Sequence, residues 1–291
     1  MIPAEILRQV RRIEIYTNRV VNETMAGRYE SVFKGRGIEF DEVREYQPGD
    51  EVRSIDWNVT ARTGRPHIKR FVEERELMVM CLVDLSRSTA FGSVRQLKNQ
   101  LAAELCAVLA FSAIKNHDKV GLLIFTDRIE RFIPPKKGLR HVLRVIREVL
   151  SFEPVGHGTD MRGALEYLNR VVRHKSVAFL ISDFVIGDLR SPLAVTNRRH
   201  DVIAMHLVDP RQETLPSIGW LRLEDAETGQ MTIVNSASAA VRQRYERWEA
   251  ERRERLQGMW RGAGVDAVEI RTDRPYVDPL LRFFRMRAHR R

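Results

Sequence analysis

The chain has 291 residues, of which 43% are hydrophobic and 30% charged. These values are ordinary for a globular protein and exclude collagen-like, disordered and disulfide-scaffold classes. The longest nearly uncharged stretch, residues 176–184, is far shorter than the roughly 20 apolar residues of a membrane-spanning helix. Residues 1–12 lack the apolar segment of a secretory signal, and Cys81 and Cys106 lie in apolar runs typical of buried thiols. We therefore expect a cytoplasmic protein with no transmembrane segment.

The net charge of +10 is the unusual figure, and it raises the possibility of nucleic-acid binding. Residues 1–77 contain 14 basic and 14 acidic side chains, whereas residues 241–291 contain 14 basic and 8 acidic ones. Arginine and glutamate alternate along residues 242–255, which is typical of a solvated helix face carrying ion pairs. Only the tail is unbalanced, and its arginines are Arg282, Arg285, Arg287, Arg290 and Arg291.

The N-terminal part of the chain, residues 1–76, is expected to form a helix followed by a turn-rich module. Apolar residues recur at three- and four-residue steps from residue 3 to about residue 25 and predict an amphipathic helix. Glycines and prolines then separate short pieces such as 37–46 and 67–74, which indicates extended structure with little helix. We expect Trp57, Tyr46 and Phe40 to lie in a core rather than to form an exposed platform.

Residues 77–291 alternate between apolar runs and helical patterns. The continuous apolar run at 77–85 is typical of a strand buried on both faces of a parallel sheet. The alternation predicts an α/β fold with a doubly wound, mostly parallel sheet flanked by helices. Strands are predicted at 77–85, 120–125, 129–133, 176–181, 202–208 and 266–270, and helices at 96–116, 139–150, 161–173, 192–198 and 278–289.

Two local features interrupt this alternation. Pro134 and Pro135 are expected to end the strand at 129–133. The segment 220–235 predicts a β-hairpin that turns between residues 225 and 229, and Ser236 is expected to cap the long charged helix after it.

Oxygen-bearing side chains follow the predicted buried strands or open the next helix. In open α/β sheets ligands bind at the carboxyl ends of the strands, so these side chains are the first candidates for a site. A set made of carboxylates and hydroxyls suits a hard cation such as Mg²⁺. Asp and Ser at such positions are also ordinary helix caps, and this alternative stays open. The candidates are Asp84, Ser86, Ser88, Thr159 and Asp183.

The spacing of these candidates resembles the metal-ion-dependent adhesion site of von Willebrand factor type A domains. Asp84-x-Ser86-x-Ser88 follows a buried strand, Thr159 stands in a glycine-rich loop, and Asp183 ends a later strand. The resemblance implies that the three hydroxyls ligate Mg²⁺ or Mn²⁺ and that the two aspartates supply charge directly or through water. It also implies an open position on the cation for a carboxylate of a protein partner.

Upstream residues resemble the signature of the domain-of-unknown-function family DUF58. The resemblance implies a type A fold and a MoxR-type AAA+ ATPase as partner. From the residues alone, the block 35–62 could hold itself together by pairing Arg44 and Arg53 with Asp50 and Asp56, or it could dock a partner. The matching pieces are Gly35-x-Gly37-x-Glu39-Phe40, Val43-Arg44-x-Tyr46-x-Pro48-Gly49-Asp50, Arg53-x-Ile55-Asp56-Trp57, Ala61-Arg62 and Glu73-Glu74-Arg75-Glu76.

The leading functional hypothesis is a cytoplasmic protein-binding module that is not an enzyme. It would serve as an accessory or adaptor to the AAA+ ATPase and capture a carboxylate of that ATPase or of its client through the bound cation. One alternative is a metal-dependent phosphoryl-transfer or hydrolytic enzyme using Asp84. Against it, no second aspartate stands two residues after Asp84, and no lysine or histidine base is expected near the candidate segments. The other alternative is nucleic-acid binding by the basic tail. The oligomeric state is left open.

Overall fold

The computed structural model of the chain describes residues 39–72, 77–94 and 96–290. The chain divides into two compact units, and the division falls between Leu77 and Met78. The helix predicted at 3–25 and the signature residues Gly35, Gly37 and 73–76 lie outside the described residues. The proposed domains, 1–76 and 77–291, therefore stay a prediction.

The smaller unit is built on a two-stranded antiparallel sheet. Strand β1 (Glu39–Glu45) pairs with β2 (His67–Val72), which confirms the predicted extended character of this segment. The chain between them forms a 3₁₀ turn, η2 (Val52–Ser54), and a short helix, α3 (Trp57–Thr63), that the sequence pattern did not indicate.

Two aspartates of the signature block stabilise its local structure. The carboxylate of Asp56 accepts hydrogen bonds from the amides of Asn58 and Val59 and so caps α3. The guanidinium of Arg44 lies 2.7 Å from Asp50 and lowers the pKa of that carboxyl. Trp57 is 67% exposed, so the expectation that it lies in a core is wrong. Trp57 is the first residue of α3, a helix of seven residues that buries none of its side chains.

The larger unit contains a six-stranded sheet in the order β10-β7-β6-β3-β4-β5. Neighbouring strands are parallel except for β4 and β5, which confirms the predicted doubly wound, mostly parallel sheet. The strands are β3 (Met78–Asp84), β4 (Lys119–Phe125), β5 (Ile129–Lys136), β6 (Val177–Ser182), β7 (Asp201–Val208) and β10 (Asp266–Arg271).

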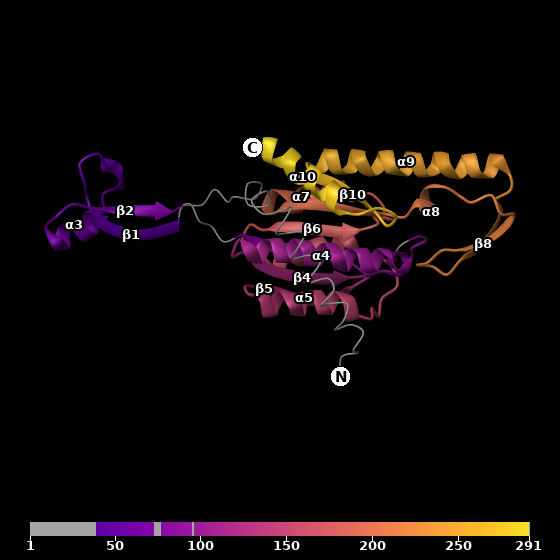
Figure 1. Cartoon of the computed structure of the whole chain (residues 1–291), viewed down its shortest axis with the longest axis horizontal. Helices are drawn as coiled ribbons and strands as arrows, with labels where there is room; N and C mark the ends of the chain where they lie inside the picture. The colour runs from indigo at the N-terminus through magenta and orange to yellow at the C-terminus, as the bar shows by residue number, and fades with distance from the viewer. Residues whose placement is uncertain (1–38, 73–76, 95, 291) are drawn as a thin grey trace. The chain divides into compact units, whose positions relative to one another are not determined.

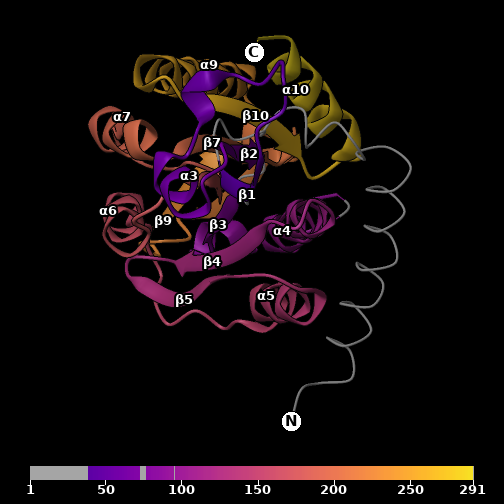
Figure 2. The ribbon, with the colours of Figure 1, turned by 90° about the vertical axis from the view of Figure 1, so that its left-hand side faces the viewer.

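Helices cover both faces of this sheet (Figure 2). One face carries α4 (Lys98–Lys115), α5 (Leu139–Ser151) and α10 (Val277–Arg290). The other carries α6 (Met161–Val171), α7 (Arg190–Arg199) and α9 (Ala239–Ala263), whose apolar residues join those of the sheet in one core cluster. A short helix, α8 (Pro210–Glu213), follows β7. The doubly covered sheet explains why its strands read as continuous apolar runs.

Two boundary predictions are wrong. Strand β5 continues through Pro134 and Pro135 to Lys136. It can do so because it lies at the edge of the sheet, and its register with β4 shifts between Val120 and Leu122, opposite the prolines that lack an N–H. Ser236 does not cap α9, because its hydroxyl donates to the carbonyl of Gly219 and closes the base of a hairpin instead.

That hairpin pairs β8 (Trp220–Glu224) with β9 (Met231–Asn235), as predicted. Figure 1 shows it beyond the end of the sheet to which the β6 arrow points. Within the described ranges, no helix has both the length and the apolar character needed to cross a bilayer. Cys81 and Cys106 are free and buried, as expected.

A buried histidine between α7 and β7 makes stability depend on pH. His200 is buried, its Nδ1 lies 2.9 Å from the Ser176 hydroxyl oxygen, and burial together with Arg199 lowers its pKa from 6.5 to about 4. Because the folded pKa lies below the unfolded one, its contribution is complete above about pH 6.5 and is lost as the pH falls toward 4. We expect H200Q to lose less stability than the wild type on acidification from about pH 7.5 to about pH 5.

Urea unfolding at a series of pH values measures this difference. The exposed His174 of the same unit supplies the matched control, because H174Q makes the same chemical change without removing a buried ring. Equal pH slopes for H200Q, H174Q and the wild type would contradict the assignment.

Candidate metal centre

Asp84 ends β3 beside the end of β6. The two strands are parallel neighbours, with Val83 opposite Ile181, so the next residues of each strand lie side by side. The hydroxyl of Ser182 donates to Asp84 Oδ2 at 2.6 Å, and the amide of Ser86 donates to Oδ1 at 2.9 Å. The carboxylate of Asp84 is fully buried, and neutral donors of Ser182 and Ser86 stabilise it.

The two predicted serine ligands lie together in the turn after β3. Their hydroxyl oxygens are 3.1 Å apart, and the hydroxyl of Thr89 donates to the carbonyl of Ser86 at 2.7 Å. The amide of Arg87 donates to the carbonyl of His157 at 3.2 Å and so joins this turn to the loop that carries Thr159. The structure thus brings Asp84, Ser86 and Ser88 into one group.

The loop before α6 is held close to the end of β4. Glu130 accepts hydrogen bonds from the amides of Val155 and Gly156 at 3.0 and 2.7 Å. A Cβ at Gly156 would overlap the hydroxyl of Thr126, so only glycine allows this close approach. Asp160 then caps α6 through the amide of Gly163 at 2.9 Å.

Thr159 makes a contact that sequence reasoning missed. Its hydroxyl donates to Oε1 of Glu227 at 2.7 Å, and Glu227 lies in the turn of the β8–β9 hairpin. Burial and the charges of Asp183, Asp225 and Asp127 raise the pKa of Glu227. The predicted hairpin indicated a turn at this position but did not show that it reaches the candidate site.

Asp183 pairs with a buried lysine. The Nζ of Lys98 lies 2.5 Å from Asp183 Oδ2, and the two side chains are 0% and 2% exposed. The expectation that no lysine lies near the candidate segments is wrong. Because α4 follows β3 and begins at the carboxyl edge of the sheet, its first residue, Lys98, returns to the end of β6.

The site carries more negative than positive charge. Burial, and then the charge of Asp183, raises the pKa of Asp84 to about 7. Lys98 supplies one positive charge, and it pairs with Asp183. Asp84 and Glu227 both interact electrostatically with Asp183, so three carboxylates share this end of the sheet.

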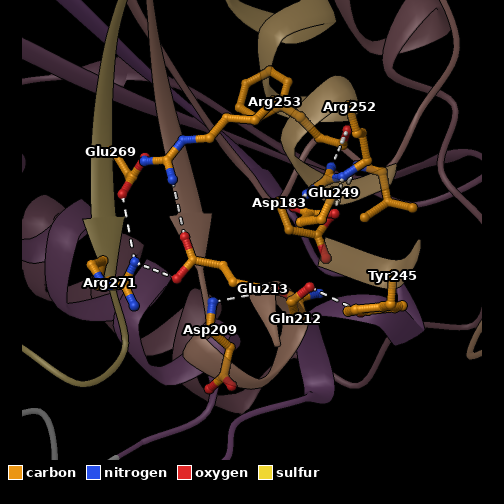
Figure 3. Close-up of polar contacts among 12 residues, drawn as sticks. Asp183, Asp209, Gln212, Glu213, Tyr245, Glu249, Arg252, Arg253, Glu269 and Arg271 are labelled. Carbon is orange, nitrogen blue, oxygen red and sulfur yellow. Dashed lines mark hydrogen bonds and ion pairs between the residues drawn. The ribbon is translucent and has the colours of Figure 1, made fainter. Parts of the chain in front are cut away.

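Helix α9 holds the segment that follows Asp183. Arg252 contacts Glu249 through two nitrogens at 2.8 and 2.6 Å, and it reaches the carbonyl of Phe184 at 3.5 Å. Figure 3 shows Asp183 beside this Arg252–Glu249 pair. Phe184 has a left-handed backbone, with φ of 51°, which turns the chain sharply after the aspartate.

A second ion-pair cluster fixes α9 to the rest of the unit (Figure 3). Arg253 contacts both Glu213 of α8 and Glu269 of β10, and Arg271 contacts Glu213 at 2.7 Å. Some charged side chains of α9 therefore form ion pairs with residues of other elements rather than with residues of the same helix.

The oxygen set at this end of the sheet could hold a hard divalent cation. Asp84 and Asp183 supply carboxylates, and Ser86, Ser88 and Thr159 supply hydroxyls, which are the ligand types of Mg²⁺ and Mn²⁺. The part of the chain that the structure describes contains no cluster of three carboxylate, histidine or cysteine side chains arranged as a metal site. Mg²⁺ bound by few protein ligands keeps several of its waters, and hydroxyl and carboxylate oxygens are compatible with such a cation.

The basic tail is partly neutralised. Arg287 is paired with Asp201 at 2.6 Å and with Asp266 at 2.9 Å, and Arg290 also contacts Asp266. Arg282 and Arg285 are exposed, and Arg291 lies outside the described residues. These ion pairs give the tail a role in binding α10 to the sheet.

Comparison with known proteins gives the family. The family model described as "Protein of unknown function DUF58" matches residues 42–255. The chain belongs to the DUF58 family. It is 33% identical over 278 residues to the uncharacterized protein Rv1480 of Mycobacterium tuberculosis, a match that covers 94% of this chain and 87% of that protein. It is also 28% identical over 107 residues to the uncharacterized protein YeaD of Bacillus subtilis, covering 37% of this chain and 25% of that protein.

Solved structures similar to this DUF58 protein include a BatB protein and a VWA domain. BatB of Bacteroides thetaiotaomicron matches 73% of this chain and 99% of its own, with 14% identity and a TM-score of 0.47. The SpRpn10 VWA domain matches 71% of this chain and 94% of its own, with 12% identity and a TM-score of 0.40.

The Lys98–Asp183 pair leads to a prediction about stability. Removing one partner of a buried ion pair leaves an uncompensated charge and costs roughly 3–5 kcal/mol. We expect K98M to lower the free energy of unfolding by about that amount, and the double variant K98M/D183N to recover part of the loss. Urea unfolding measures both changes. The interpretation fails if K98M is as stable as the wild type, or if the double variant is no better than K98M.

Proposed function

We propose that this DUF58 protein is a binding module that captures a carboxylate of a protein partner through a divalent cation. Asp84, Ser86, Ser88 and Thr159 would hold the cation, and Asp183 would supply further charge. The observation that carries the proposal is the buried carboxylate of Asp84, which is bonded to neutral donors and lies beside a second carboxylate and two serine hydroxyls. The proposal assigns no catalytic role to these residues.

The donor types support capture of a carboxylate rather than tight metal storage. Neutral hydroxyls donate little charge to a cation, and Lys98 already neutralises part of the charge of Asp183. A cation held in this way stays electrophilic and binds an additional anionic oxygen well. Mg²⁺ is the first candidate, and Mn²⁺ accepts the same ligands.

The proposed partner is a MoxR-type AAA+ ATPase or its client, with this protein as accessory or adaptor. This part of the proposal rests on the resemblance of the block 35–62 to the DUF58 signature. The net charge of +10 also favours an acidic partner surface, because complementary charge speeds and orients association.

Metal binding tests the first part of the proposal. We expect the full chain to bind Mn²⁺ in isothermal titration calorimetry, and S88A and D84N each to weaken binding by about tenfold or more through loss of a ligand oxygen or of charge. S151A is the matched control, because Ser151 is exposed at the end of α5 and its hydroxyl contacts the carbonyl of Arg147. If Mn²⁺ does not bind, or binds S88A, D84N and the wild type equally, the metal site is wrong.

Partner capture tests the second part. We expect immobilised wild-type protein to retain an AAA+ ATPase from extracts of its source cells in Mg²⁺, and to lose it when EDTA is added. We expect D84A to retain none while keeping the circular dichroism spectrum of the folded wild type. An ATPase that is retained equally by D84A, or in EDTA, would show that a metal bridge is not the mode of capture.

A further inference from the structure

The tip of the β8–β9 hairpin has a fixed shape. Asp225 accepts hydrogen bonds from the amides of Glu227 and Thr228 at 3.0 and 2.8 Å. The amide of Gly229 donates to the carbonyl of Asp225 at 2.8 Å, and Gly229 has the left-handed φ of 71° that this turn requires. The turn therefore presents the side chain of Glu227 in a defined direction.

That direction is toward the candidate metal centre. Glu227 Oε1 accepts the hydrogen bond from Thr159, and Oε2 lies 3.7 Å from the position that a Cβ would occupy on Gly158. The carboxylate is also close enough to Asp183 to interact with it electrostatically. Thr159 and Glu227 are 68 residues apart in the sequence, so the fold, and not local chain geometry, brings them together.

A carboxylate bonded to a proposed ligand hydroxyl has the chemistry expected of the partner group. We propose that Glu227 is an internal ligand of the metal centre, taking the place on the cation that a partner's carboxylate takes when the partner binds. This inference rests on the proposed function and deepens it. A partner would then have to displace the tip of the hairpin.

The way the hairpin is held is consistent with such an exchange. Within the described residues, the Thr159–Glu227 contact is the one hydrogen bond that joins the hairpin, residues 220–235, to a part of the unit other than the residues that follow the hairpin directly in the chain. At the base, the amide and hydroxyl of Ser236 both donate to the carbonyl of Gly219. Loss of the tip contact would thus free the tip and leave the base closed.

The exposed side chains of the hairpin indicate what a partner would meet there. Trp220, Met231 and Ile233 are 73%, 52% and 67% exposed, and strand pairing places them on one face of the hairpin. The same face also carries the exposed Arg222 and Glu224, so a partner that replaces Glu227 with its own carboxylate can cover both apolar and charged side chains there.

Mn²⁺ binding by the full chain tests the inference without an identified partner. We expect E227Q to bind Mn²⁺ about tenfold more weakly than the wild type in calorimetry, because one charged ligand oxygen is lost. Water should replace the lost carboxylate oxygen on the cation, so the Mn²⁺ bound to E227Q should increase the relaxation rate of water protons more than the Mn²⁺ bound to the wild type. E224Q is the matched control, because Glu224 is exposed on the same hairpin and the substitution removes the same charge.

Hydrogen exchange gives a second measurement at the hairpin itself. We expect Mn²⁺ to slow amide exchange of residues 225–230 in the wild type and in E224Q, and to have no such effect in E227Q. If the wild type binds Mn²⁺ and S88A does not, while E227Q matches the wild type in affinity, relaxation and exchange, then the inference fails and the proposed function stands. If the wild type binds no Mn²⁺, both fail.

Discussion

The larger unit buries two carboxylates, those of Asp84 and Asp183, at the ends of parallel strands. The rest of the unit has to stabilise these charges. Asp84 and Asp183 follow neighbouring strands that are covered on both faces, so neither carboxylate can be hydrated freely. Burying a charge is costly unless it is paired or hydrogen-bonded. The surrounding elements therefore supply hydrogen-bond donors or positively charged side chains to these two carboxylates.

The groups that stabilise these buried carboxylates come from separate parts of the chain. Helix α4 contributes the ammonium of Lys98, β6 contributes the hydroxyl of Ser182, and the turn after β3 contributes amides and hydroxyls. Helix α9 fixes the following segment through Arg252. The hairpin brings a further negative group, Glu227, which accepts a hydrogen bond from the proposed ligand Thr159, and this contact makes it a candidate ligand rather than a structural support.

The sequence predicted the layers of the fold, and it placed Asp84, Ser86 and Ser88 in one turn, where the structure also brings them together. Continuous apolar runs could be identified as strands buried on both faces, and the motif from Asp84 to Ser88 depends on local geometry within a single turn. Lys98 and Glu227 could not be found in this way, because their partners are 85 and 68 residues distant. Ser236 was misassigned for the same reason: its hydroxyl closes the hairpin across 17 residues.

Strand β5 limits the ways in which another chain can pair with the edge of the six-stranded sheet. An unpaired edge strand ordinarily offers a row of amides and carbonyls to which another strand can be added. Pro134 and Pro135 have no N–H, so they interrupt that row, and they coincide with a shift in register, which makes this edge a poor template for a further strand. Assembly by extension of the sheet is therefore obstructed on this side.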